Sequence, residues 1–232
     1  MYFSLIRLRR NVLPKDVVAL GNGNAYQLHK LIWNLFSDGP DRRRDFLYRY
    51  EAVHGCLTFY TVSAREPNDP SDLWEIHSKQ YTPKISKGER LAFSVRVNPV
   101  CSKRDERRRR QRHDVVMEAK RRIAFKELPH QERPHVATLV QEAGLAWLKA
   151  REVGLGFHVE GNNEAPMVRA DGYVQHKLFR GKGVEAVDFH TLDFNGVLTV
   201  TDPDIFIKEC LYKGIGPAKG FGCGLMMVRR IT

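Results

Sequence analysis

A tyrosine and a histidine three positions apart are the side chains in this sequence best placed to move protons. Tyr26 and His29 lie in the segment YQLHKLIWNLF. Residues i and i+3 of a helix are surface neighbours, so the phenol and the imidazole would sit together. An imidazole titrates near neutral pH and acts as a general acid or base. A tyrosine hydroxyl is a poor base but can orient a reacting group. The alternative is that His29 is an ordinary boundary histidine on a helix flank.

A second candidate is the glycine-rich stretch GIGPAKGFGCG, which runs from Gly214 to Gly224. Glycine lets backbone N–H groups approach phosphates closely. The expected order here is helix, loop, strand, whereas nucleotide-binding fingerprints run from strand through loop to helix. The stretch therefore disfavours an ATP or NAD site. We expect its amides and Lys219 to face nucleic-acid phosphates. The alternative is a turn that contacts nothing.

The charge of the 232-residue chain indicates the partner. The sequence carries 38 Lys and Arg against 27 Asp and Glu, a net charge of +11. Such an excess favours a polyanion, most simply a nucleic acid. Membrane-surface binding would require a basic amphipathic helix, and the basic residues are expected in loops and strands instead. The sequence shows no span-length apolar run and no signal-peptide pattern, so we expect a cytoplasmic protein without a membrane partner.

No metal or cofactor site is expected. The four cysteines form no CxxC pair, and the nine histidines include no HExxH or HxxxH pair. Acidic residues do not cluster at metal-ligand spacing, and Asp202-Pro203-Asp204 is better explained as a helix start. The remaining chemistry is proton transfer by side chains.

One helix must carry the Tyr26–His29 pair. Leu28, Leu31, Ile32 and Leu35 repeat at i, i+3, i+4 and i+7, which predicts a helix over 24–36 with one apolar stripe. Asn24 would cap it, with Gln27 completing a capping box. The elements predicted around it are strand 2–9, strands 46–53 and 56–64, a helical or irregular stretch near 71–78, and strand 90–99.

The second half repeats this order more loosely. Its predicted elements are a polar connection at 101–112, a short strand near 115–125, a helix at 135–151, a hairpin of 172–180 and 184–192 extended by 194–200, a helix at 203–213 and a last strand. The pattern predicts an α+β fold of two tandem ferredoxin-like, RRM-like βαββαβ domains. The predicted domains are 1–100 and 113–232, joined by a basic linker at 101–112. Each sheet would offer RNA an open face or an edge.

Four segments together resemble one family: YQLHKLIWNLF, SVRVNP, FNGVLTV and GIGPAKGFGCGL. Their order and spacing are similar to those of the CasE family, the repeat-processing endoribonucleases of type I-E CRISPR systems. The resemblance covers nearly the whole chain. The glycine loop is the hallmark of the wider superfamily of repeat-cleaving Cas endonucleases, whereas Tyr-x-x-His is more specific to this branch.

The resemblance implies an activity and its residues. The family cuts the repeat hairpin of a CRISPR transcript at the 3′ base of the stem, without metal. It stays bound to the product and joins the other subunits of the Cascade complex. By resemblance, His29 and Tyr26 are catalytic. The implied RNA-binding residues lie in a basic hairpin and in the glycine loop: Lys177, Arg180, Lys182, Gly214, Gly216, Lys219, Gly222 and Gly224.

RNA supplies its own nucleophile for this reaction. Attack of the 2′-OH on the adjacent phosphate gives a 2′,3′-cyclic phosphate and a 5′-OH, with help in alignment and proton transfer. One histidine cannot make both proton transfers in one concerted step, so the second group stays open. Arg107 and Arg108 in the arginine run are further phosphate candidates, and a solvated tether is the alternative. Competing functions are a non-catalytic RNA-hairpin-binding subunit and a general basic nucleic-acid binder.

Overall fold

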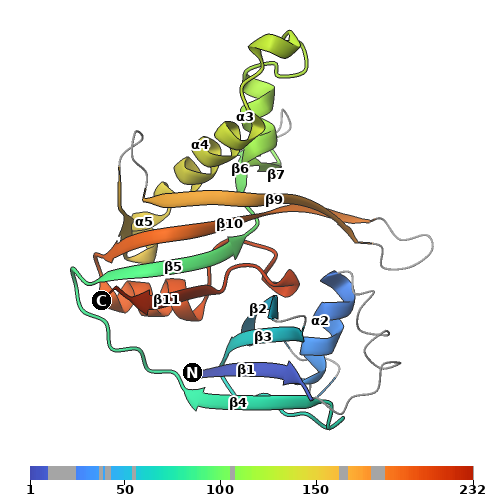
Figure 1. The fold of residues 1–232 in the computed structure, drawn as a ribbon, viewed down its shortest axis with the longest axis vertical. Helices are drawn as coiled ribbons and strands as arrows, with labels where there is room; N and C mark the ends of the chain where they lie inside the picture. Colours follow the sequence, from blue (N-terminus) through green and yellow to red (C-terminus); the bar gives the residue numbers. More distant parts are fainter. Residues whose placement is uncertain are drawn as a thin grey trace.

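The computed structural model describes residues 1–9, 25–36, 39, 43–53, 56–104, 108–161, 167–178 and 186–231. The described chain builds two large antiparallel sheets that lie one above the other and one small two-stranded sheet; helix α2 (Ala25–Asn34) stands beside the lower large sheet (Figure 1). The expected α+β class with two tandem ferredoxin-like domains is confirmed by this architecture and by the solved structures compared below.

The first sheet has the strand order of a ferredoxin-like fold. Its strands run antiparallel in the order β2-β3-β1-β4. Helix α2 connects β1 to β2. The elements are β1 (Tyr2–Leu8), α2 (Ala25–Asn34), β2 (Phe46–Val53), β3 (Cys56–Ser63) and β4 (Trp74–Gln80).

The predicted apolar stripe of α2 is confirmed. Leu28, Ile32 and Leu35 are buried, and they pack with Ile6 of β1 and Phe59 of β3 in one core cluster. The burial of one helix face on the sheet leaves the flank that carries His29 at the edge of this core, where His29 is half-buried. The expected cap Asn24 lies outside the described residues.

The second sheet follows the same plan with a longer hairpin. Strand β10 pairs with β9 from Val187 to Gly196 and with β5 from Leu192 to Thr199. Strand β11 lies beyond β5, and short β8 pairs with the end of β10. The strands are β5 (Arg90–Val97), β8 (Phe157–Val159), β9 (Val168–Leu178), β10 (Val187–Val200) and β11 (Met226–Arg230).

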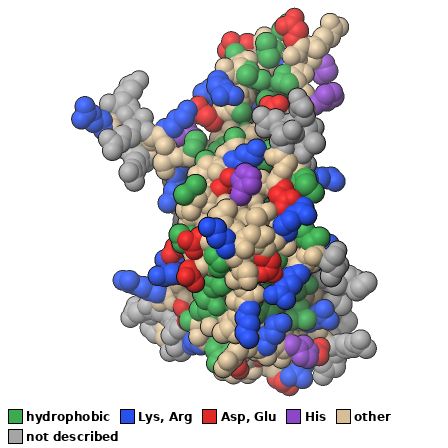
Figure 2. Space-filling model, turned by 90° about the vertical axis from the view of Figure 1, so that its left-hand side faces the viewer, with side chains coloured by type: hydrophobic (Ala, Val, Ile, Leu, Met, Phe, Trp, Pro, Cys, Tyr) green, Lys and Arg blue, Asp and Glu red, His purple; other side chains and the backbone are tan. Residues whose placement is uncertain are grey.

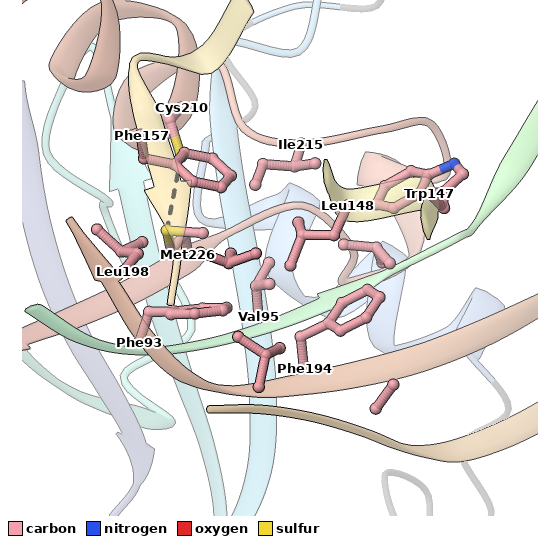
Figure 3. Close-up of a cluster of buried hydrophobic side chains, with 14 of the residues drawn as sticks. Phe93, Val95, Trp147, Leu148, Phe157, Phe194, Leu198, Cys210, Ile215 and Met226 are labelled. Atoms are coloured by element: carbon pink, nitrogen blue, oxygen red, sulfur yellow. Dashed lines mark hydrogen bonds between the residues drawn. The ribbon is translucent and has the colours of Figure 1, made fainter. Parts of the chain in front are cut away.

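Helices from two parts of the chain cover this sheet. Figure 3 shows Trp147 and Leu148 packing with Val95 and Phe194 of the sheet, while Cys210 contacts Met226. The predicted helix at 203–213 is confirmed, and Asp202 caps it by accepting from the N–H of Ile205. Its second part is wound as a π-helix. The helical segments are η1 (His130–Glu132), α4 (Val136–Lys149), α5 (Glu152–Leu155), α6 (Pro203–Ile205), η2 (Phe206–Tyr212) and η3 (Lys219–Phe221).

The last strand of the first sheet is β4, not the predicted 90–99. The segment near 71–78, expected to be helical or irregular, contains buried Trp74, which pairs with Leu8. The Asp69 carboxylate accepts from the N–H of Trp74 and so fixes the start of β4. Strand β5, predicted for the first domain, joins the second sheet because Leu91, Phe93, Val95 and Val97 face its core. We therefore propose a domain boundary between β4 and β5 rather than at residue 100.

Two predictions between β5 and α4 are also wrong. The polar run 101–112 is not only a connection, because β6 (Val100–Arg104) and β7 (Arg110–Asp114) pair as a hairpin. The predicted strand near 115–125 is helix α3 (Val115–Arg122). The Asp114 carboxylate accepts from the N–H of Met117 and caps this helix. An N-cap aspartate satisfies an N–H group of the first turn and so favours a helix that starts at Val115.

The sheet faces predicted to be open partly cover each other. Arg49 of β2 donates to the Ser94 hydroxyl of β5 at 2.8 Å, and Arg96 lies 5.8 Å from the ring centroid of Tyr50. Leu47 and Val62 of the first sheet form a buried cluster with Leu225, just before β11. RNA therefore cannot reach these parts of the two faces.

The glycine loop runs through the contact between the two sheets. Gly214, Gly216, Gly222 and Gly224 all have positive φ. A Cβ on Gly214 would lie 2.7 Å from Leu47 Cδ1 and 2.8 Å from the carbonyl oxygen of Gly224. Glycine is therefore required at 214 by both backbone conformation and space.

We expect Gly214→Ala to lower the free energy of unfolding by about 2–4 kcal/mol. Overpacking contributes about 1–3 kcal/mol, and the left-handed backbone adds about 1 kcal/mol. Chemical denaturation measures the change. Gly154→Ala is the matched control, because a Cβ there meets nothing within 4 Å. Equal effects of the two substitutions would contradict this account of the loop.

Candidate active site

The glycine loop brings the C-terminal part of the chain against the first helix. A Cβ on Gly220 would lie 3.7 Å from Cε1 and 3.8 Å from Nδ1 of His29. The same point is 3.2 Å from Nη1 of Arg44. Gly220 is held in place by Tyr48 of β2, whose hydroxyl donates to the Gly220 carbonyl at 2.8 Å. The absence of a side chain at 220 therefore lets an imidazole and a guanidinium converge on one point.

Two aromatic rings pack near the imidazole ring of His29. Its ring centroid lies 5.6 Å from that of Trp33, one turn further along α2, and 5.9 Å from that of Phe221 in the loop. His29 and Trp33 therefore lie on the same flank of α2. Tyr26 belongs to α2, but its side chain lies outside the described residues, so the Tyr26–His29 contact stays a prediction.

Arg44 lies at this point, and Lys219 in the same loop is close enough to feel its charge; only Lys219 was predicted from the sequence. Lys219 precedes Gly220, and its ammonium group donates to the carbonyl of Lys213 at 2.5 Å. Partial burial lowers the pKa of Lys219, and the charges of Arg44 and Lys213 lower it further. Partial burial also lowers the pKa of Arg44. Two cations repel each other in a partly buried site. Such a site therefore favours a bound anion that lies between them.

Arg44 was missed because its sequence context is uninformative. It is one of three successive arginines in DRRRD, all outside any predicted element. Only the fold shows that Arg44, rather than its neighbour Arg43, approaches Gly220. A weak signal was available, because residue 44 lies just before β2 and close to the end of α2.

The predicted RNA-binding glycines have structural contacts of their own. A Cβ on Gly216 would lie 3.4 Å from the Trp147 ring, and one on Gly222 would lie 3.1 Å from the Tyr50 ring. A Cβ on Gly224 would lie 2.7 Å from the Ile215 carbonyl oxygen. The alternative of a loop that contacts nothing is therefore wrong. RNA contact by these glycines stays a prediction.

The remaining predicted RNA-binding residues are cationic, and two of them are described. Lys177 is exposed on β9, one residue from the end of the described part of that strand, and Arg108 is exposed just before β7. Arg107, Arg180 and Lys182 lie outside the described residues. Strand β9, which carries Lys177, approaches helix α2, which carries His29.

The surface away from α2 carries both signs of charge. Figure 2 shows Lys and Arg interspersed with Asp and Glu on that face, without a single basic field. Within the described ranges, no helix combines the length and apolar character needed to span a bilayer. In the same ranges, no three His, Cys, Asp or Glu side chains gather in a way that could hold a metal ion.

The cluster can perform acid–base chemistry beside a bound anion. His29 supplies a proton-transfer group, and the two cations stabilise negative charge that develops within their reach. Arg44 and the imidazole both approach Gly220, so a phosphate there would meet these two groups, and the charge of Lys219 acts on the same part of the loop. This arrangement suits phosphoryl chemistry better than acyl or redox chemistry.

Comparisons with known proteins agree on one family. The family model for "CRISPR associated protein" matches residues 1–230. The CRISPR system Cascade subunit CasE of Escherichia coli is 32% identical over 219 residues, which is 92% of this chain and 96% of CasE. The CRISPR-associated endoribonuclease Cse3 of Thermus thermophilus is 26% identical over 218 residues, with 88% of this chain and 90% of Cse3 covered.

A solved structure supports the fold. The structure of Thermus thermophilus Cse3 bound to an RNA that represents a pre-cleavage complex has a TM-score of 0.67 and 20% identity. The match covers 98% of both chains. The two tandem ferredoxin-like units are thus shared along nearly the whole length.

We expect Arg44→Gln to raise the pKa of Lys219. Loss of the nearby guanidinium charge removes one cause of the lowered value, while partial burial keeps the pKa below its ordinary level. NMR titration of the lysine side-chain resonances measures the shift. Arg43→Gln is the control, since Arg43 is not among the charges that shift Lys219. An unchanged pKa in Arg44→Gln would show that the two cations do not interact.

Proposed function

The chain belongs to the CRISPR associated protein family, and we propose that it is an endoribonuclease that cuts the repeat hairpins of a CRISPR transcript. Cleavage occurs at the 3′ base of the stem and uses no metal, because the RNA provides the nucleophile. The protein then keeps the mature RNA and joins Cascade as a subunit. A cytoplasmic location suits an enzyme that acts on new transcripts.

The observation that carries the proposal is the approach of His29 and Arg44 to Gly220, the residue that follows Lys219 in the glycine loop. The family match alone concerns relatives named for Cascade and for endoribonuclease activity. The convergence of an imidazole and a guanidinium on a residue without a side chain, with the charge of Lys219 acting on the guanidinium's surroundings, adds a chemical reason from this chain itself. If His29 had only a structural role on the helix flank, nothing would require cations nearby or a glycine against its ring.

His29 transfers a proton in the proposed mechanism. The ribose 2′-OH attacks the adjacent phosphorus in line, and the P–O5′ bond breaks to leave a 2′,3′-cyclic phosphate and a 5′-OH. His29 acts as base toward the 2′-OH or as acid toward the leaving 5′ oxygen. Tyr26 orients the 2′-OH or the phosphate by hydrogen bonding. The other transfer passes to water, which fits a slow enzyme that retains its product.

Arg44 and Lys219 stabilise the phosphorane charge. Cations already held in place before the reaction stabilise a developing anion without reorganising. Burial lowers the pKa of both groups, and the charge of Arg44 lowers that of Lys219 further. Both pKa values rise again when a phosphate lies between the two cations. The sequence did not identify the second catalytic group. We assign this place to Arg44 and Lys219, which stabilise charge rather than transfer a second proton.

Binding of the stem is mainly electrostatic. The β9–β10 hairpin extends beyond the body of the second domain and carries exposed Lys177. Lys177, Arg180 and Lys182 contact phosphates of the stem, because side chains cannot read the deep, narrow major groove of A-form RNA. Arg107 and Arg108 add phosphate contacts from the β6–β7 hairpin.

We expect His29→Ala to lower single-turnover cleavage of a repeat stem-loop about 10²–10⁴-fold. Affinity for the RNA should change little, because phosphate contacts dominate binding. EDTA should leave the wild-type rate unchanged. His77→Ala is the matched control, because His77 is exposed on β4 and pairs with Glu75.

Two results would contradict this assignment. Wild-type protein that binds the stem-loop tightly and leaves it uncut would indicate a non-catalytic RNA-binding subunit. Equal competition by unrelated RNA would indicate a general basic nucleic-acid binder.

We expect Arg44→Ala to lower the cleavage rate about 10²-fold, the usual effect of removing one group that stabilises transition-state charge. Arg44→Lys should restore part of the rate by returning the charge without the planar fork. The rate at saturating protein is measured, with Arg43→Ala as control. A similar loss in both alanine variants would point to general attraction of RNA rather than to charge stabilisation.

A further inference from the structure

A pocket opens on the far side of Phe221 from His29. Its volume is about 330 Å³, in the range of small-molecule sites. The Phe221 ring stacks 5.2 Å from Phe189, which lines the pocket, while its distance to the His29 ring is 5.9 Å. Pocket and proton-transfer site are therefore separated by one aromatic side chain.

One wall of the pocket is the free edge of a strand. Strand β10 begins at Val187, but β5 joins it only from Leu192, because β5 ends at Val97. Along Val187–His190, the described part of the chain offers only β9 as a pairing partner. Glycine-loop residues Pro217 and Ala218 also line the pocket.

Two buried polar atoms belong to residues that line this pocket and lack hydrogen-bond partners among the described residues. One is Oδ1 of Asn98, a residue with only 7% of its surface exposed. The other is Oδ2 of Asp114, whose side chain is 10% exposed. Its nearest ionic neighbour there is Nδ1 of His190 at 3.8 Å, too far for a hydrogen bond. Buried polar atoms are rarely left unsatisfied, so each indicates an external donor.

The other oxygen of Asp114 is fully used inside the protein. Oδ1 accepts from the Tyr173 hydroxyl at 2.6 Å and from the N–H of Met117 at 2.8 Å. Burial and the carboxylate together raise the pKa of Tyr173, which keeps the phenol as a donor. Asp114 is thus fixed at one oxygen and presents the other as an acceptor.

We propose that this pocket receives one unpaired base of the bound RNA, and that Asp114 and Asn98 select a base that carries an amino group. The inference rests on the proposed function, because RNA must already be seated at His29. A carboxylate can only accept, so Oδ2 takes an N–H of adenine, cytosine or guanine. Uracil has no amino group, and its one ring donor available for pairing, N3–H, lies between two carbonyl oxygens that a carboxylate would repel. Phe189 and Phe221 provide aromatic surface of the kind on which unstacked bases pack.

The test is a coupling experiment on affinity, so it does not depend on cleavage. A repeat stem-loop with its flanking nucleotides is changed to uridine at one unpaired position at a time. Each RNA is titrated against His29→Ala and against the double variant His29→Ala/Asp114→Asn. Asparagine caps helices about as well as aspartate, so α3 should persist.

We expect one position at which uridine weakens binding to His29→Ala about tenfold. This is the effect expected from the loss of one or two hydrogen bonds to a charged group. The double variant should show no such preference, because its amide also donates to uracil. Asp188→Asn in the same background is the control. Asp188 lines the pocket too, but its carboxylate already accepts from Gln175 at 2.8 Å.

The outcomes separate the two proposals. If every uridine substitution affects both proteins equally while the stem-loop is bound and cut by wild type, the base pocket is wrong and the nuclease stands. If the stem-loop is neither bound nor cut, the proposed function fails and the pocket fails with it.

Discussion

The close packing of the glycine loop between two domains is the constraint on which the rest of this structure depends. At Gly214 and Gly222 the backbone has positive φ and passes so near Leu47 and the Tyr50 ring that a methyl group would collide or crowd. This proximity brings Gly220 under the Tyr48 hydroxyl. The imidazole of His29 and the guanidinium of Arg44 then face a loop of the second domain that carries Lys219, an arrangement that neither domain could assemble alone.

The same loop lies between His29, the proposed proton-transfer residue, and the proposed base pocket. Phe221 contacts His29 on one side and stacks on Phe189 on the other. A base in the neighbouring pocket and a phosphate at Gly220 would therefore be positioned by one short segment. Binding energy from the base can then contribute to alignment at the reacting phosphate. A small shift of the loop would disturb both.

Local sequence patterns predicted the elements in which one regular face is buried in a single core. The stripe of α2 and the hairpins of both sheets follow from periodicity, and the Tyr-x-x-His segment singled out the flank of the first helix that the glycine loop approaches. Sheet membership of Arg90–Val97 was not predictable, because a strand that alternates Leu91, Phe93 and Val95 fits either core equally well. Arg44 and the Asp114 pocket depend on tertiary proximity, which spacing along the chain does not encode.

The hydrogen bond between Tyr48 and Gly220 joins residues 172 positions apart in sequence. During synthesis on the ribosome, the N-terminal part of a chain folds first. A half-made polypeptide would thus display His29 without the loop that faces it. Chains not yet extended through residue 220 should be harmless to messenger RNA nearby, since cutting ability arises only after this loop has been made.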